Sequence, residues 1–467
     1  MSMFNKYFID YRVFVTLLIM STEKNIVTRM APSPTGRFHV GGIRTAFYNY
    51  AFARKHGGKF ILRIEDTDKE RNQKEYEDEI YEVFKWVGMD YDEVYRQSEH
   101  LERHQEILRN LIDNGNAYEA EGAKDGSGNV IRFKNPNKEI TFSDEILGDI
   151  TVDTTDLGDF VIARNNQSPL YHLAVVVDDY DEGVTHVIRA QEHVANTPRQ
   201  ILLHEALGFT TPTYAHVPFI LGPDGKKKLS KRDTNVAALD YKEQGYLPEA
   251  LLNFLAFIGW NPGTEQELFS KDELVNAFNL EQVQKGPGGY NLEKLAWLNK
   301  QWLNKRTEQE FRAYIDPLFN ELRDTPIYRE EVMEKITPLI RERTEVLADV
   351  QTMITEGELD YYFVDPEINT EKVIWKKGTK EDTISHLEKV SEMIGSYSED
   401  WNKEDLKSHI FPYADELGRG DVLWPLRYSL SGRDKSPDPF TLLEVLGKDT
   451  SLRRITSTIN ELRKNTG

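Results

Sequence analysis

The sequence predicts a multidomain protein in which a parallel α/β sheet domain, split by a small α/β insertion, precedes a helical connector and an all-helical region. Strand and helix patterns alternate at first, short alternating runs replace them from about Ala117 to Ala163, and amphipathic stretches dominate after Gly225. The expected domains are residues 1–21 (an N-terminal extension), 22–116 and 166–222 (two halves of the sheet domain), 117–165 (the insertion), 223–305 (the connector) and 306–467 (the helical region).

The first elements form a βαβ unit. Ile26 to Met30 has the pattern of a short strand, and the Pro- and Gly-rich stretch that follows breaks it into a loop. A helix is expected from about Gly42 to the stop signal His56-Gly57-Gly58, before a second strand from Phe60 to Ile64. This unit predicts a parallel, Rossmann-like sheet whose first loop lies at the carboxyl edge, where ligands bind.

The later elements extend and interrupt this sheet. Two amphipathic helices, at 76–87 and 101–112, are expected to cover it, and the strand-rich insertion follows them. Beyond the insertion, Leu173 to Val177 and Val184 to Arg189 are predicted as strands. Thr197 is expected to be the N-cap of a helix with Pro198 in its first turn. Helical patterns then fill 247–258, 292–303 and most of the chain to Asn465.

Composition restricts the function classes. The 467 residues suffice for roughly three domains. The formal net charge of -20 argues against indiscriminate coating of nucleic acid, so any RNA partner must meet local basic patches. The absence of cysteine excludes disulfides, thiolate nucleophiles and Cys-ligated zinc, and it fits a cytoplasmic protein.

A short apolar run from Phe8 to Met20 is the one segment that resembles a targeting signal. It is too short to span a bilayer, and no small-residue cleavage site follows it. The run is therefore interpreted as an extension upstream of a natural start at Met20. No membrane partner is expected.

The first candidate site is the loop from Pro32 to Gly42. The free N–H groups and the dipole of the helix that begins there attract phosphate. Glycine at Gly41 and Gly42 would let a nucleotide approach the backbone, and the imidazole of His39 can donate hydrogen bonds to phosphate oxygens. Taken alone, such a glycine pair is more typical of simple turn geometry.

The second candidate site is the run from Gly225 to Asp233, which carries five cations. An isolated run of this kind is usually a solvated surface. Beside a nucleotide-binding loop, however, mobile lysines suit triphosphate chemistry, where catalysis depends on positioning and electrostatics. The two loops together predict a nucleotide site more strongly than either one alone.

The order of these motifs resembles that of glutamyl-tRNA synthetases of the bacterial type. The resemblance is carried by Ala31 to Gly36, His39 to Gly42, Arg63 to Asp68 and Lys228 to Arg232, and it extends to 187–193, 196–200, 294–299, 425–427 and 430–432. The segments at 39–42 and 228–232 resemble the two signature motifs of class I synthetases. Only the first twenty-odd residues fall outside the resemblance.

The resemblance implies a set of site residues. Catalytic roles fall on His39, Lys228 and Lys231; ATP binding on Pro32, Ser33, Thr35, His39, Gly41, Gly42, Ser230 and Lys231; glutamate binding on Arg29, Ala31, Ser33, Glu65, Tyr171 and Arg189. Residue chemistry agrees, because Arg29 or Arg189 can bind the γ-carboxylate while Glu65 holds the α-ammonium. Two structural alternatives stay open: Glu65 could cap a helix, and Tyr171 could be an ordinary sheet aromatic.

The insertion departs from the family pattern. Relatives often hold zinc there with Cys and His, but 117–163 contains neither residue, so no structural zinc and no protein metal site are expected. The insertion should instead be held by its own small β core, made of Val130, Ile131, Phe133, Ile140, Phe142, Ile146, Ile150 and Val152. Its contacts with the tRNA acceptor stem are the function placed in doubt.

The resemblance implies an ATP-dependent ligase that activates L-glutamate, with Mg²⁺ accompanying the ATP, and transfers it to tRNA(Glu). A monomer is expected. A glutaminyl-tRNA synthetase should end in β-barrels rather than helices, and a tRNA-modifying relative should be shorter. A non-catalytic RNA-binding paralogue should have lost His39 or the lysines, and a generic nucleotidyltransferase should lack the helical third. Whether tRNA(Gln) is also charged stays open.

Overall fold

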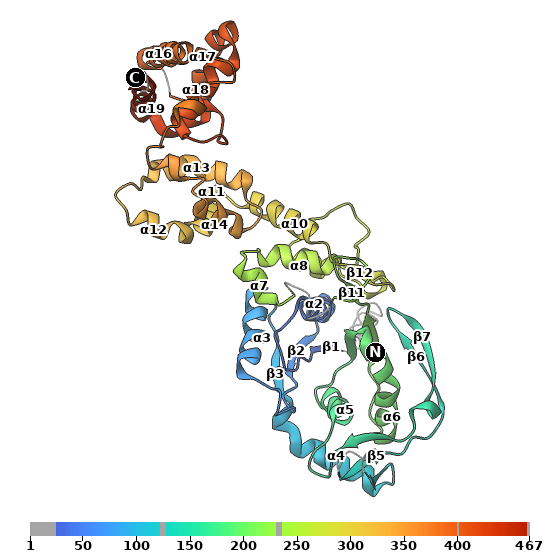
Figure 1. Cartoon of the computed structure of the whole chain (residues 1–467). Coiled ribbons are helices and arrows are strands. Elements are labelled where there is room, and N and C mark those ends of the chain that lie inside the picture. The colour runs from blue at the N-terminus through green and yellow to red at the C-terminus, as the bar shows by residue number, and fades with distance from the viewer. Residues whose placement is uncertain (1–24, 122–127, 230–235, 399–400, 465–467) are drawn as a thin grey trace, which may run out of the picture. The chain divides into compact units, whose positions relative to one another are not determined.

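The computed structural model describes residues 25–121, 128–229, 236–398 and 401–464, so the apolar run from Phe8 to Met20 lies outside it. The chain divides into two compact units, residues 1–302 and 303–467 (Figure 1). The first unit contains every strand of the described chain, and the described part of the second contains helices alone. This arrangement confirms the predicted combination of a sheet domain with an all-helical region.

The predicted βαβ unit is confirmed. Strands β1 (Val27–Met30) and β2 (Lys59–Ile64) are parallel and in register from Val27 beside Lys59 to Met30 beside Leu62, with helix α2 (Val40–Lys55) between them. The second strand also pairs in parallel with β3 (Glu93–Arg96), which follows helix α3 (Lys74–Trp86) and precedes η1 (Gln97–His100) and α4 (Leu101–Asp113). Helix α2 is buried along most of its length because it also packs against helices of the connector.

The second half of the sheet joins the first at β1. It contains α5 (Tyr171–Asp181), β9 (His186–Ala190), η3 (Gln191–Asn196), α6 (Thr197–Leu207) and β10 (Thr213–Val217). The backbone N–H of Thr185 donates to the carbonyl of Val27 at 3.0 Å, and the Thr185 hydroxyl accepts from the N–H of Val27 at 2.9 Å. The strands therefore lie in the order β3-β2-β1-β9-β10. This order is Rossmann-like, because successive strands are added to one side of β1 in the first half and to its other side in the second half.

Two predictions in this half are wrong. Leu173 to Val177 is not a strand but the buried middle of helix α5, which packs against helices α4 and α6. A short apolar run does not distinguish a strand from a helix that is covered on several sides. Thr197 is the first residue of α6 rather than its N-cap, which is Asn196. The expected end of that helix at Gly208 is confirmed by a left-handed C-cap.

The insertion forms two small pieces of sheet. An antiparallel sheet contains β4 (Ala117–Glu121), β5 (Asn129–Phe133) and β8 (Phe160–Ala163). The hairpin of β6 (Glu139–Asp144) and β7 (Gly148–Asp153), followed by η2 (Thr154–Leu157), pairs with β10 through Asp144 and Tyr214.

The expectation of a separate core in the insertion is wrong. Phe133, Ile140 and Phe142 belong to one apolar cluster with Val187 and Leu202 of the sheet domain. The reason is that β6 adds directly to the edge of the sheet, so the apolar face of the hairpin covers residues of the sheet domain.

The connector is largely helical, as predicted. Its elements are β11 (Ile220–Leu221), α7 (Ala238–Glu243), α8 (Pro248–Phe257), α9 (Lys271–Ala277), η4 (Leu280–Gln282), β12 (Gly288–Gly289) and α10 (Leu292–Lys305). The pairing of β11 with β12 is an addition that the sequence pattern does not reveal. Helix α10 contains the boundary between the two units.

The second unit consists of helices packed around their own buried residues. They are α11 (Glu308–Ile315), η5 (Asp316–Phe319), α12 (Asn320–Arg323), α13 (Glu330–Arg343), α14 (Leu347–Thr355), η6 (Asp360–Tyr362), α15 (Thr370–Val373), α16 (Lys380–Ser396), α17 (Lys403–Leu417), α18 (Arg419–Ser431) and α19 (Pro439–Lys464), which is interrupted at Gly447. Buried Arg454 donates to the carbonyl oxygens of Tyr361 at 2.7 Å, Leu430 at 2.6 Å and Val364 at 2.9 Å. This one side chain therefore joins α19 to α18 and to residues 361–364.

Candidate active site

The candidate site lies at the carboxyl edge of the sheet, where β1 and β9 adjoin. Arg29 lies near the end of β1 and Arg189 near the end of β9. Both side chains are buried. In doubly wound sheets this crevice is where ligands bind, because the connections on either side of it leave the sheet in opposite directions.

The guanidinium of Arg29 is already paired with a carboxylate. It donates to the two oxygens of Asp179 on α5 at 2.9 and 3.4 Å. Arg63 also pairs with Asp179 and donates to Glu182 at 3.0 and 2.8 Å. Burial opposes ionisation of Asp179, but the charges of Arg29 and Arg63 outweigh it and lower the pKa of that carboxyl. Arg29 is therefore held in a buried ion network and is not an isolated positive charge.

Arg189 is different, because it makes no ion pair with a carboxylate among the described residues. Its Nε donates to His216 Nε2 at 3.2 Å, and its Nη2 donates to the hydroxyl of Thr197 at 2.8 Å. Its Nη1 is buried without a hydrogen-bond partner in the described part of the chain, and burial lowers the Arg189 pKa. A buried cation in this state is costly unless an anion completes it, so the site suits a carboxylate ligand.

Glu65 supplies a carboxyl group beside these arginines. Glu65 follows β2, and its backbone N–H donates to the carbonyl of Pro32 at 3.0 Å. Burial raises the pKa of Glu65 to about 7, against the opposing charges of Arg63 and Arg29. The partly exposed side chain accepts no hydrogen bond from any described residue, so it remains available to an ammonium group.

Tyr171 is not a sheet aromatic, because it is the first residue of helix α5. Its hydroxyl lies 3.2 Å from His193 Nδ1, and burial raises its pKa. The charges of Glu65 and Arg189 both act on this hydroxyl. The structure thus brings four predicted residues, Arg29, Glu65, Tyr171 and Arg189, into one electrostatic environment.

A cavity of about 350 Å³ adjoins this environment through Ala190 and Glu192. Its lining consists of His39, Gly41, Arg44, Thr45, Ala190, Glu192, Pro218, Phe219, Ile220, Lys228, Leu229 and Val236. His39 is the N-cap of α2, and its Nδ1 accepts from the backbone N–H of Gly42 at 3.3 Å. The cavity therefore lies at the start of a helix, where free N–H groups favour phosphate.

The two glycines of the first motif have different surroundings. A Cβ at Gly41 would lie 3.0 Å from the imidazole of His39, on the cavity side. A Cβ at Gly42 would lie 2.8 Å from the ring of Phe38, outside the cavity lining. Close packing therefore explains Gly42, whereas Gly41 lines the cavity.

The loop from Ala31 to Thr35 connects β1 to this helix. Ala31 and Thr35 are partly exposed, Pro32 is buried and Ser33 is exposed. The N–H of Thr35 donates to the carbonyl of Ser33 at 2.8 Å, which forms a tight turn. The loop thus lies between the arginine site at the end of β1 and the nucleotide-sized cavity at the start of α2.

The residues on both sides of the lysine run lie beside the same cavity. The N–H of Leu229 donates to the carbonyl of Ile220 at 2.8 Å, and that of Val40 donates to the carbonyl of Val236 at 3.0 Å. Lys228 pairs with Glu192, and its ammonium lies 4.5 Å from the ring centre of Phe219. Ser230, Lys231 and the rest of the run to Asp233 lie outside the described residues. Both flanks of that segment nevertheless border the cavity that contains His39.

Sequence reasoning missed several residues of this site. His216 and Thr197 hold Arg189, Asp179 holds Arg29, and Glu192 pairs with Lys228. One signal was available, because His216 is a polar residue in the middle of the otherwise apolar stretch from Tyr214 to Val217. Thr197 is only eight residues from Arg189, but it lies on a different element, and the contacts of Asp179 and Glu192 join segments 150 and 36 residues apart.

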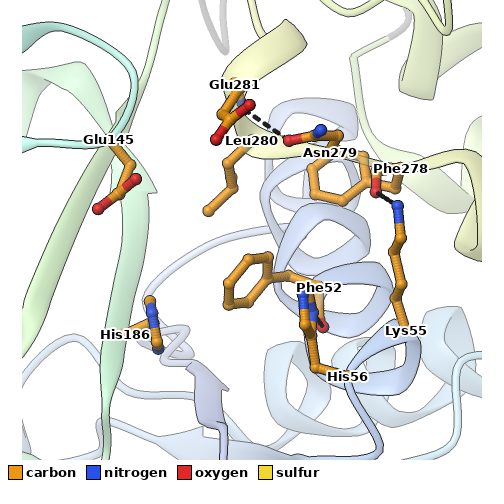
Figure 2. Close-up of a pocket in the computed structure, with 9 residues that line it drawn as sticks. All are labelled: Phe52, Lys55, His56, Glu145, His186, Phe278, Asn279, Leu280 and Glu281. Carbon is orange, nitrogen blue, oxygen red and sulfur yellow. Dashed lines mark hydrogen bonds between the residues drawn. The ribbon is translucent and has the colours of Figure 1, made fainter.

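A second cavity, of about 280 Å³, is separate from this site. It lies between the end of α2, Glu145, His186 and the segment from Phe278 to Glu281 (Figure 2). Lys55 donates there to the carbonyl of Phe278 at 2.7 Å. None of the predicted site residues that the structure describes lines it.

The described ranges contain no group of three or more His, Cys, Asp or Glu residues that could hold a metal ion. No helix in those ranges is long and apolar enough to cross a membrane.

The fold and the paired motif loops define a class I aminoacyl-tRNA synthetase. Residues 25–126 and 119–297 match the family of class I tRNA synthetases (E and Q), catalytic domain, and residues 295–459 match the anticodon binding domain.

Within that class the chain belongs to the glutamate–tRNA ligase family. It is 38% identical to glutamate–tRNA ligase 1 of Alkalilimnicola ehrlichii, over 93% of this chain and 98% of the relative. It is 36% identical to glutamate–tRNA ligase of Francisella tularensis subsp. novicida, over 94% of this chain and 100% of the relative. The crystal structure of a glutamate tRNA ligase from Elizabethkingia meningosepticum in complex with its amino acid superposes with a TM-score of 0.83 at 32% identity, over 94% of this chain and 100% of that one.

Proposed function

We propose that this enzyme esterifies L-glutamate to tRNA(Glu) in two steps. The α-carboxylate of glutamate attacks the α-phosphorus of ATP and pyrophosphate leaves, which gives glutamyl-adenylate. A ribose hydroxyl at the end of the tRNA then attacks the carbonyl carbon and AMP leaves. The observation that carries the amino-acid assignment is the buried guanidinium of Arg189, which has a free Nη1 and no carboxylate partner in the described chain.

The proposed glutamate site divides the work among three charged groups. Arg189 pairs with the γ-carboxylate, because a guanidinium presents a planar fork to two oxygens. Glu65 holds the α-ammonium, and this role is supported because no described residue donates a hydrogen bond to its carboxylate. Arg29 is a weaker candidate than Arg189 for binding the γ-carboxylate, because its guanidinium is already paired with Asp179. Tyr171, Ala31 and Ser33 would border the bound amino acid.

The proposed ATP site is the cavity at the start of α2. His39, Lys228 and Lys231 would stabilise charge that develops on the phosphate oxygens, and Pro32, Ser33, Thr35, Gly41 and Ser230 would form the rest of the nucleotide site. Gly42 would contribute indirectly, because its N–H donates to His39. The ion pair with Glu192 keeps the Lys228 ammonium at the cavity wall, which supports this proposal. Mg²⁺ would accompany the ATP, held by phosphate oxygens and water. No protein nucleophile takes part.

The same proposal includes a monomeric enzyme without structural zinc, in which the helical unit binds the anticodon. Cytoplasmic location stays a prediction. The domain boundaries given from the sequence are likewise retained as a proposal, with the insertion sharing the core of the sheet domain.

Exchange of labelled pyrophosphate into ATP, measured with and without tRNA, tests the activation step. We expect exchange that depends on glutamate. The absence of exchange under both conditions would indicate a non-catalytic paralogue, and exchange driven by glutamine in preference to glutamate would indicate a glutaminyl-tRNA synthetase.

A further inference from the structure

A chain of buried hydrogen bonds extends behind Arg189 into the inserted hairpin. Arg189 Nε donates to His216 Nε2 at 3.2 Å, and His216 Nδ1 lies 2.6 Å from Asp144 Oδ2. His216 is fully buried and Asp144 is 2% exposed. The three residues come from β9, β10 and β6, which are neighbours in one sheet. The amino-acid site is therefore linked through two side chains to the insertion.

The protons in this chain follow from the chemistry of the partners. A guanidinium only donates hydrogen bonds, so His216 Nε2 must be the acceptor and must carry no proton. His216 Nδ1–H then donates to Asp144. The Asp144 carboxylate also accepts from the backbone N–H groups of Ile146 at 3.0 Å and Leu147 at 2.8 Å. Every polar atom between Asp144 and Arg189 Nε is thus fixed in one direction.

We propose that His216, oriented by Asp144, is a positioning residue that fixes Arg189 for the side-chain carboxylate of the amino acid and so sets the preference for glutamate over glutamine. This inference rests on the proposed function. The imidazole is a neutral acceptor, so it orients the guanidinium without neutralising it, and Nη1 keeps its full donor capacity.

Arg29 provides the internal comparison. Asp179 contacts Arg29 directly through both oxygens, which satisfies its charge. At Arg189 the nearest carboxylate in the hydrogen-bond chain, Asp144, is separated from the guanidinium by the imidazole ring. A substrate carboxylate completes such a site, whereas the neutral amide of glutamine leaves the buried charge unpaired.

Two substitutions of His216 distinguish its hydrogen bond to Arg189 from its hydrogen bond to Asp144. In His216→Asn the amide nitrogen can replace Nδ1 toward Asp144, but nothing replaces the acceptor at Arg189. We expect the KM for glutamate to rise about tenfold or more, since a hydrogen bond to a charged group is lost. The kcat and the KM for ATP should stay within about twofold. In His216→Gln the amide oxygen can replace Nε2, so the KM for glutamate should recover toward the parent value.

A double-mutant cycle with Arg189→Ala tests whether His216 acts through Arg189. In the Arg189→Ala background, His216→Asn should change the KM for glutamate by less than about twofold. His186→Asn is the matched control, because His186 lies on the same strand as Arg189 but lines the separate cavity (Figure 2). That control should leave all three constants unchanged.

The outcomes distinguish this inference from the proposed function. Absence of glutamate-dependent exchange and charging in the parent enzyme would refute the function. An active parent with an unchanged glutamate KM in His216→Asn, or the same factor in both backgrounds, would overturn the role of His216 alone. If His216→Asn fails to fold by circular dichroism, His216→Gln decides, and a tenfold rise in its glutamate KM would overturn the inference.

Discussion

At the scale of single residues, the site depends on which charges are satisfied inside the protein. The sequence presents Arg29 and Arg189 as equivalent candidates for the substrate carboxylate. The structure separates them, because Asp179 pairs with Arg29 while the described partners of Arg189 are all neutral. A partner more than a hundred residues away cannot be read from a local pattern, so residue chemistry alone left this choice open.

Glu65 gives a pH prediction. Its pKa is raised to about 7, so below that pH the carboxyl is mostly protonated and loses its attraction for the α-ammonium. We expect kcat/KM for glutamate to fall as the pH drops through about 7, because this ratio reports ionisation of the free enzyme. Measuring kcat/KM from about pH 6 to about pH 8.5 checks it. Loss of the same limb in Glu65→Gln, at a much lower rate, would assign the limb to this residue.

The same shift has a consequence for stability. The pKa of Glu65 is about 7 in the folded state and 4.5 ordinarily, so the folded state binds the proton more tightly. This preference stabilises the fold fully below pH 4.5, and the stabilisation is lost as the pH rises to about 7. Glu65→Gln should therefore raise the melting temperature relative to the parent at about pH 8 and not at about pH 4. A variant that is less stable than the parent at both pH values would contradict the assigned pKa.

At the scale of elements, the sequence predicted the βαβ unit, the covering helices and the helical second unit. It failed at α5, where Leu173 to Val177 are buried in succession because neighbouring helices cover the helix. It also assigned the insertion a core of its own, because strand alternation predicts a buried face but not what covers it. The motif loops were predictable, since glycine, proline and charged residues mark them locally. The supporting residues His216 and Thr197 were not, because their partners come from other elements.

The lysine run is tested by comparing two of its members. Lys231→Ala should lower the rate of activation by about several powers of ten while KM values change much less, because the ammonium acts on transition-state charge. Lys227→Ala in the same run is the control and should retain nearly full activity. Pyrophosphate exchange with both variants gives the comparison, and full exchange in Lys231→Ala would remove this run from the catalytic site.

We expect the activity and stability of the enzyme to survive metal removal, because of how the insertion is packed. Its apolar residues share the core of the sheet domain, so its folding needs no metal ligands. Prolonged EDTA treatment followed by restored Mg²⁺ should leave aminoacylation and melting temperature unchanged. Stoichiometric zinc in protein purified without a tag, with activity that returns only on adding zinc, would show that the insertion has been misinterpreted.

At the scale of the whole molecule, the chemistry and the helical unit belong to different compact units. All described residues of the proposed glutamate and ATP sites lie in residues 1–302. The second unit has its own buried centre, in which Arg454 satisfies three carbonyl groups of two other segments. Substrate binding and helical packing should therefore stabilise different parts of the chain.

Calorimetry tests this division. We expect two unfolding transitions, of which glutamate and ATP raise only the one from the first unit, because ligands stabilise the unit that binds them. Arg454→Met should lower the free energy of unfolding of the second unit alone, by about 3 kcal/mol or more, since it leaves buried carbonyl groups without donors. A single transition that responds to both changes would show that the two units unfold as one.

We infer that this chain joins glutamate to tRNA(Glu) and that the charge of Arg189 selects the amino acid. The most direct measurement is charging of purified tRNA(Glu) with labelled glutamate and, separately, labelled glutamine, in the presence of ATP and Mg²⁺. We expect glutamate to be esterified to the tRNA with release of AMP and pyrophosphate, and glutamine not to be. Failure to charge tRNA(Glu) with glutamate, or charging with glutamine at a comparable rate, would contradict this inference.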